Sequence, residues 1–169
     1  MPNTTKIIVR AGLIAGLYVV LSLLTLPVAS GAIQFRLSEA LTILPLFFIE
    51  AVPALFVGCM LSNLITGCAI FDIVFGSLIT LVAGFFTYLC SKAIKIIGLK
   101  IFVGGLFPVL LNALLLPVVW VYCYGALEYI YIIQSVILLV SQSVVIYLLG
   151  TPTYLGVRKM KENGIKFFM

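Results

Sequence analysis

The chain has 169 residues, of which 64% are hydrophobic and only 9% are charged. A soluble domain is roughly half apolar and a quarter charged, so this composition excludes an ordinary water-soluble protein and indicates one that lies mainly in lipid. The net charge of +5 is not a nucleic-acid signal, because its distribution along the chain is what membrane topology alone requires. No nucleic-acid partner is therefore predicted.

Six hydrophobic segments follow one another without a linker or a soluble insertion. Five are uncharged runs of about 20 residues, the length that a bilayer core of about 30 Å requires. The remaining segment reaches about 16 residues if it begins near Gln34, enough for a thinned or shielded span, and Pro53 then suits the first turn of the next helix. The predicted helices are 7–28, 34–49, 52–67, 71–91, 99–121 and 127–150. We predict one all-α, polytopic membrane domain over 1–169 with six transmembrane helices.

The distribution of basic residues predicts the orientation of these helices. With six spans, nine of the ten Lys and Arg residues fall on one side, and cytoplasmic loops are the ones that collect such residues. Arg36 is the exception, and it lies on the side that also carries Glu39, Asp72 and Glu128. Both termini are therefore expected in the cytoplasm. The inward basic residues are Lys6, Arg10, Lys92, Lys95, Lys100, Arg158, Lys159, Lys161 and Lys166.

The first predicted helix carries a strip of small residues, Ala11, Gly12, Ala15 and Gly16, in its cytoplasmic half. Such a strip lets another helix approach closely, either within the same bundle or on a separate membrane partner. The helix also imitates a signal peptide, but its apolar run is longer than the 7 to 15 residues of a normal signal core.

Ionisable side chains at membrane depth are costly and indicate pairing or function. Arg36 and Glu39 are three residues apart on one expected helical face, where they form a local ion pair or present a donor and an acceptor to a ligand. Asp72 opens the fourth helix, as an ordinary cap or as a ligand group. Gly76 and Thr80 below it make room for a flat ligand or for a neighbouring helix.

Further polar and aromatic side chains are expected near the same outer end. Asn63, Asn112 and Gln134 are amides whose default role is interhelical hydrogen bonding. Trp120 belongs to an aromatic cluster typical of a membrane interface, from which one ring is available to stack on a ligand.

Several motifs are missing from the sequence. There is no histidine, the four cysteines lack metal-ligand spacing, and no phosphate-binding loop is present. Cys68 and Cys123 lie near the outer face and are a possible disulfide pair. No cofactor, metal site or enzymatic activity is predicted, and uphill transport requires a partner or an ion gradient.

The segment Gly31–Thr42, followed by Leu44 and Pro45, resembles the queuosine-precursor (QueT) family of S components of energy-coupling factor (ECF) transporters. The block Gln-Phe-Arg-x-Ser-Glu-Ala within it is the most specific part. The likeness continues over nearly the whole chain, through Pro53, Gly58, Ser62, Asn63 and the run Asp72–Ser77.

This resemblance implies a substrate-binding subunit in a bacterial cell membrane. Its implied ligand is a 7-deazaguanine such as preQ0, preQ1 or queuine, and its implied partners are a transmembrane coupling subunit and two ATPases. An Ala-x-x-x-Ala strip commonly docks S components on that subunit, and Ala11 and Ala15 match it here. The residues expected to bind the substrate at the outer end of the bundle are Arg36, Glu39, Asn63, Asp72, Asn112, Trp120 and Glu128.

Two alternatives stay open at this point. One is an autonomous small carrier driven by protons through Glu39 or Asp72, and the other is an S component for a different vitamin.

Overall fold

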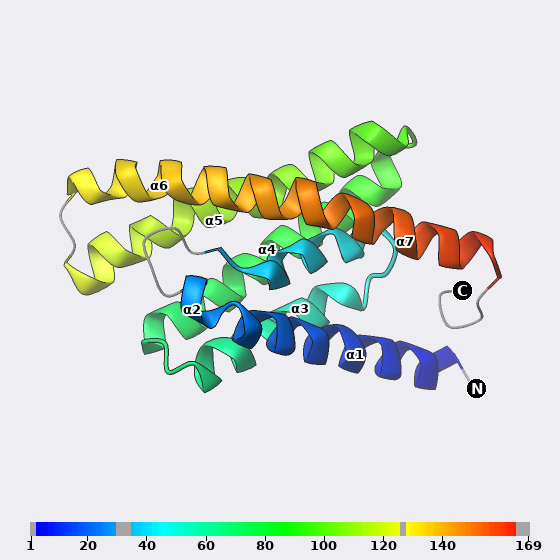
Figure 1. Cartoon of the computed structure of the whole chain (residues 1–169), viewed down its shortest axis with the longest axis horizontal. Coiled ribbons are helices and arrows are strands. Elements are labelled where there is room, and N and C mark those ends of the chain that lie inside the picture. The colour runs from blue at the N-terminus through cyan, green and yellow to red at the C-terminus, as the bar shows by residue number, and fades with distance from the viewer. Residues whose placement is uncertain (1–2, 30–34, 126–127, 165–169) are drawn as a thin grey trace.

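The computed structural model describes residues 3–29, 35–125 and 128–164, and in this part of the chain all regular structure is helical. The predicted all-α class is thus confirmed for these residues. Figure 1 shows an elongated bundle in which α1 runs along one side and α6, η2 and α7 form a nearly continuous rod along the other. The elements are α1 (Asn3–Leu24), α2 (Leu26–Ala29), η1 (Leu37–Leu46), α3 (Ala51–Ile65), α4 (Ile70–Ala93), α5 (Ile97–Tyr124), α6 (Glu128–Ser143), η2 (Val144–Leu149) and α7 (Gly150–Glu162).

Four helical segments of the described chain are long and apolar enough to cross a membrane. Two further apolar helices, η1 and α3, are shorter. A multi-pass membrane protein is therefore supported, while six complete crossings stay a prediction. The four long segments are Thr4–Leu24, Ile70–Ala93, Ile97–Tyr124 and Ile130–Glu162.

The second predicted helix differs most from expectation. In place of a span over 34–49, the chain forms the ten-residue 3₁₀-helix η1, and residue 34 lies outside the described residues. At about 2.0 Å per residue η1 is about 20 Å long, less than the bilayer core of about 30 Å. Its residues from Ser38 to Leu46 are all buried. The element η1 is therefore enclosed by the longer helices. Backbone that is not α-helical is tolerated at membrane depth in such an enclosed position.

The last predicted helix extends beyond its expected end at residue 150. The π-helical turn η2 joins α6 to α7, which continues to Glu162. Pro152 lies in the first turn of α7, where its ring and missing N–H disrupt a regular α-helical bond. The wider turn directly before it lets the rod continue past the proline.

Close contact between α1 and α3 brings the first helix up to η1. A Cβ on Gly58 would lie 2.9 Å from Tyr18 Cβ and 3.1 Å from the Ala15 carbonyl oxygen, so only glycine permits this approach. Tyr18 is fully buried in the resulting core between α1, η1 and α3. That packing directs a tyrosine hydroxyl at the centre of the bundle.

The two ends of the bundle differ in charge. Figure 1 places the start of α1, the turn between α4 and α5 and the end of α7 at the same end of the molecule. These three segments carry eight of the predicted cytoplasmic basic residues. The arrangement is the one expected of a chain that crosses the membrane an even number of times, with its basic loops on one side.

Candidate functional site

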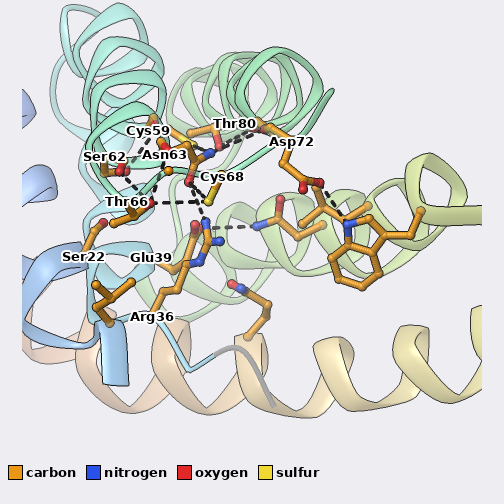
Figure 2. Close-up of a pocket in the computed structure, with 17 residues that line it drawn as sticks. Ser22, Arg36, Glu39, Cys59, Ser62, Asn63, Thr66, Cys68, Asp72 and Thr80 are labelled. Atoms are coloured by element: carbon orange, nitrogen blue, oxygen red, sulfur yellow. Dashed lines mark hydrogen bonds between the residues drawn. The ribbon is translucent and has the colours of Figure 1, made fainter. Parts of the chain in front are cut away.

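A cavity of about 290 Å³ lies among α1, η1, α3, α4, α5 and α6 (Figure 2). The cavity lies toward the end of the bundle opposite to the basic segments, since its lining includes residues at the end of α1, in the turn between α3 and α4, at the start of α4 and at the end of α5. Ligand pockets start at about 300 Å³. This cavity therefore suits one small molecule.

Glu39 places a carboxylate from η1 at the cavity wall. The residue is 4% exposed, and its Oε1 accepts a hydrogen bond of 2.8 Å from the Tyr18 hydroxyl. Its Oε2 accepts one of 3.3 Å from Asn112 Nδ2 on α5. Since a carboxylate offers about four acceptor positions, Glu39 retains capacity for further donors after these two bonds.

Arg36 contacts Asn63 and does not form an ion pair with Glu39. Its Nη1 donates to Asn63 Oδ1 at 3.2 Å, and Asn63 Nδ2 donates to the Asp72 carbonyl oxygen at 3.4 Å. Of the two roles left open for Arg36 and Glu39, the direct ion pair is not formed, because Arg36 precedes η1 in extended conformation, with φ −110° and ψ 110°. Presentation of a donor and an acceptor to a ligand stays a prediction. In the described part of the chain, the ion pairs are Arg10–Glu50 and Arg158–Glu162.

Asp72 does not cap α4. The N-cap is Ala69, no side chain caps the helix, and Asp72 lies in its first turn. Its Oδ1 accepts a bond of 2.9 Å from the Trp120 indole Nε1, and its Oδ2 one of 3.3 Å from the Tyr124 hydroxyl. The carboxylate therefore fixes the orientation of an aromatic ring on α5 that also lines the cavity.

The small-residue face of α4 serves two purposes along its length. Gly76 and Thr80 line the cavity, where their size leaves room for a ligand. Gly84 lies under η1 and α3, where a Cβ would lie 3.7 Å from Pro45 and Val52. One turn further on, Thr87 donates to the Gly104 carbonyl of α5 at 2.8 Å. The two roles expected for this face, space for a ligand and space for a helix, thus occupy different halves of α4.

The structure gathers most of the predicted binding residues at one place. Six of the seven line the cavity, whereas the side chain of Glu128 lies outside the described residues. Gln134, the other amide singled out in the sequence, is not among the lining residues. Their binding role stays a prediction. The six are Arg36, Glu39, Asn63, Asp72, Asn112 and Trp120.

The site also contains polar residues that were not predicted, among them Tyr18, Ser22 and Gln142. Tyr18 bonds to Glu39, Ser22 lines the cavity and donates to Ser38 Oγ at 2.8 Å, and Gln142 lines the cavity from α6. Each is a polar side chain inside an otherwise apolar helix. That signal was available in the sequence for Gln142 above all, because a buried amide in lipid or protein requires a partner.

The small strip of α1 is divided between the interior and the surface. Ala11 and Ala15 are half-buried and pack against the core formed with η1 and α3. Gly12 and Gly16 are exposed, and a Cβ on either would meet nothing within 4 Å. Internal packing therefore accounts for the alanines, and docking of the strip on a partner stays a prediction.

The remaining chemistry of the site is simple. All four cysteines are free thiols, so the possible Cys68–Cys123 bond is absent. Within the described ranges, no group of three His, Cys, Asp or Glu side chains could hold a metal ion. What the cavity offers a ligand is two carboxylates, a guanidinium, three amides and an indole.

In a comparison with protein families, residues 8–159 match the model described as QueT transporter. Neither the curated proteins nor the solved structures give a match. Because the family model covers most of the chain, the chain belongs to the QueT transporter family.

Proposed function

We propose that this member of the QueT transporter family is the substrate-binding S component of an ECF importer in a bacterial plasma membrane. It captures a queuosine precursor, a 7-deazaguanine such as preQ0, preQ1 or queuine, on the outer side. The observation that carries the proposal is the small cavity in which the Glu39 carboxylate and the Arg36 guanidinium lie within one lining, inside a bundle with a largely apolar surface.

The edge of a guanine-type ring matches these groups. It presents two adjacent N–H donors, which suit a carboxylate, beside a carbonyl oxygen, which suits a guanidinium or an amide. Glu39 supplies the carboxylate, Arg36 the guanidinium, and the indole of Trp120 a surface for stacking. Tyr18 and Asn112 hold Glu39 in place before the ligand arrives, so little ordering is required on binding.

Asp72 provides a second carboxylate for a substituent on the ring. The aminomethyl group of preQ1 is a cation, and an opposite charge within a few ångströms favours it. The nitrile of preQ0 has no such charge. Asp72 is therefore the residue proposed to favour preQ1 over preQ0.

Uphill transport requires a partner or an ion gradient, because the sequence has no phosphate-binding loop with which to hydrolyse ATP. We assign the energy supply to a transmembrane coupling subunit with two ATPase subunits. We assign docking on the coupling subunit to the small strip of α1. The exposed Gly12 and Gly16 leave a flat surface on which another helix can lie closely.

The test is to identify the small molecules retained by the purified protein by mass spectrometry and then to titrate preQ1 by calorimetry. A retained 7-deazaguanine and saturable binding are expected. A retained riboflavin, biotin or thiamin, with no binding of preQ1, would overturn the substrate assignment but leave the S-component role intact.

An autonomous proton-driven carrier is the second candidate, and the burial of the Glu39 carboxylate at membrane depth favours it. Purification separates the two functions. The S component co-purifies with ATPase subunits and needs them for uptake, whereas the carrier transports alone in liposomes under a proton gradient.

A further inference from the structure

Gln142 holds an acceptor that the protein itself leaves unused. The residue is 3% exposed and lines the cavity, and its Oε1 is buried without a hydrogen-bond partner. Among the described residues of the cavity lining, no other side-chain atom is in this condition. The adjacent Ser141 is satisfied, since its hydroxyl donates to the Leu138 carbonyl at 3.2 Å.

Buried polar atoms in native proteins nearly always have partners, so an acceptor that the protein leaves unpaired at a cavity is a place where a bound molecule can supply the missing group. Gln142 Oε1 is an acceptor, so the missing group is a donor. The next question is which N–H group of the ligand donates to Gln142 Oε1.

The two carboxylates of the cavity suit other donors of the ligand. Glu39 and Asp72 are carboxylates, and each already accepts two bonds from the protein while keeping further acceptor positions. Charged acceptors suit the polarised pair of N–H groups on the guanine edge and the aminomethyl cation. A free 7-deazaguanine has one more N–H, on its pyrrole ring, which is neutral and single. A neutral amide oxygen is the matching acceptor.

We propose that Gln142 is a specificity-determining residue whose Oε1 accepts the pyrrole N–H of a 7-deazaguanine free base. In the corresponding nucleoside this nitrogen carries ribose, so it has no proton to donate and its substituent collides with the amide. Gln142 thereby selects the free base over the nucleoside. The inference rests on the proposed function, because it takes the ligand class from it.

The test compares Gln142→Met, which has nearly the same shape without the amide, with the wild-type protein. Two ligands are titrated by calorimetry: preQ1, and preQ1 methylated on the pyrrole nitrogen. The wild-type protein is expected to bind preQ1 and to bind the methylated ligand much more weakly. Gln142→Met is expected to bind preQ1 roughly tenfold more weakly than the wild-type protein does. Methylation of the ligand should lower the affinity of this variant much less than it lowers the affinity of the wild-type protein.

If Gln142 had a purely structural role, its replacement would lower the melting temperature. Since no group of the protein bonds to Oε1, Gln142→Met is expected to melt at or above the wild-type temperature. Gln142→Asn keeps the amide but shortens its reach, and provides a second variant if methionine is not accommodated.

The outcomes separate the two proposals. If the wild-type protein binds preQ1 and both variants show the wild-type affinity and the wild-type penalty for methylation, Gln142 does not read the pyrrole N–H and the proposed function stands. If the wild-type protein binds none of preQ1, preQ0 and guanine, the proposed function fails and this inference fails with it.

Discussion

Glu39 and Asp72 carry the same chemical group in different surroundings, and their replacements are expected to have different effects. Glu39→Gln removes a carboxylate that faces the guanine edge, where each charge-assisted hydrogen bond is worth roughly 1.5–3 kcal/mol. We expect this variant to bind preQ1, preQ0 and guanine alike about tenfold or more weakly than the wild-type protein does. Asp72→Asn is expected to weaken the binding of preQ1 selectively, because preQ1 is the one of these three ligands that carries a cation. Calorimetric titration of the three ligands checks both expectations.

Tyr18→Phe is the matched control for Glu39. It removes the 2.8 Å bond to Oε1 while leaving the carboxylate in place, so a smaller loss is expected than for Glu39→Gln. Unchanged affinity for every ligand in both carboxylate variants would place the binding site elsewhere.

The buried ion pair at the other end of the bundle is expected to matter for stability. Arg10 Nε lies 2.8 Å from Glu50 Oε1, both side chains are about nine-tenths buried, and the guanidinium lies 4.3 Å from the Phe48 ring centroid. Glu50→Gln leaves an uncompensated buried charge, a change that costs about 3 kcal/mol or more. We expect a clearly lower melting temperature in detergent, without loss of ligand selectivity.

The Arg158–Glu162 pair provides the comparison for that variant. Its side chains are 40% and 59% exposed, and exposed pairs contribute about 0–1 kcal/mol. Glu162→Gln should therefore leave the melting temperature almost unchanged. Equal effects of the two variants would contradict the structural role assigned to Arg10 and Glu50.

Sequence reasoning at the residue scale found the charged and amide groups of the cavity but not their pairing. The ion pair considered for Arg36 and Glu39 assumed helical spacing, whereas the extended backbone at Arg36 directs its side chain to Asn63. Tyr18 was missed because a tyrosine in an apolar helix gives no sign of its partner 21 residues away. Contacts between helices depend on their relative rotation, which a single sequence does not specify.

At the scale of elements, the long helices were predicted well and the irregular ones were not. Length and hydropathy are sufficient to place α4 and α5, since both quantities follow from the bilayer. They do not distinguish the 3₁₀-helix η1 from an α-helix, because the enclosed position of η1 is a property of the whole bundle. The π-turn η2 is likewise set by the local accommodation of Pro152.

The division of the α1 strip gives a prediction about docking. Gly16→Trp places a large ring on an exposed face with open space around it, so internal packing is unaffected. We expect it to abolish transport by the full complex while leaving ligand binding to the isolated subunit intact. Uptake and calorimetry, measured on the same variant, check the two halves of this expectation.

Ala15→Trp separates docking from folding. Ala15 packs against the α1–α3 contact, where its carbonyl oxygen would lie 3.1 Å from a Cβ on Gly58. This variant should therefore also lower the melting temperature of the isolated subunit. Normal assembly of both tryptophan variants with the coupling subunit would show that the strip is not the docking surface.

On the scale of the whole molecule, the two ends are specialised by charge and by cavity. One end carries the basic segments that flank α1, α4, α5 and α7, and the other carries the polar cavity. A binding subunit that takes its ligand from outside requires the cavity end to face outward. The positive-inside rule independently predicts that the basic end faces the cytoplasm, so the two arguments agree on one orientation.

This orientation predicts a pattern of chemical labelling in intact cells. In a variant whose four cysteines are replaced, Ala69→Cys introduces a thiol at the exposed start of α4 beside the cavity, and Lys95→Cys introduces one in the exposed turn between α4 and α5. A membrane-impermeant maleimide is expected to label Ala69→Cys from outside, and Lys95→Cys only after the membrane is opened. Because α4 joins the two positions and is long enough to cross the bilayer, they must lie on opposite sides if α4 spans it. Labelling of Lys95→Cys in intact cells would reverse the orientation and leave the cavity facing the cytoplasm, which is incompatible with capture from outside.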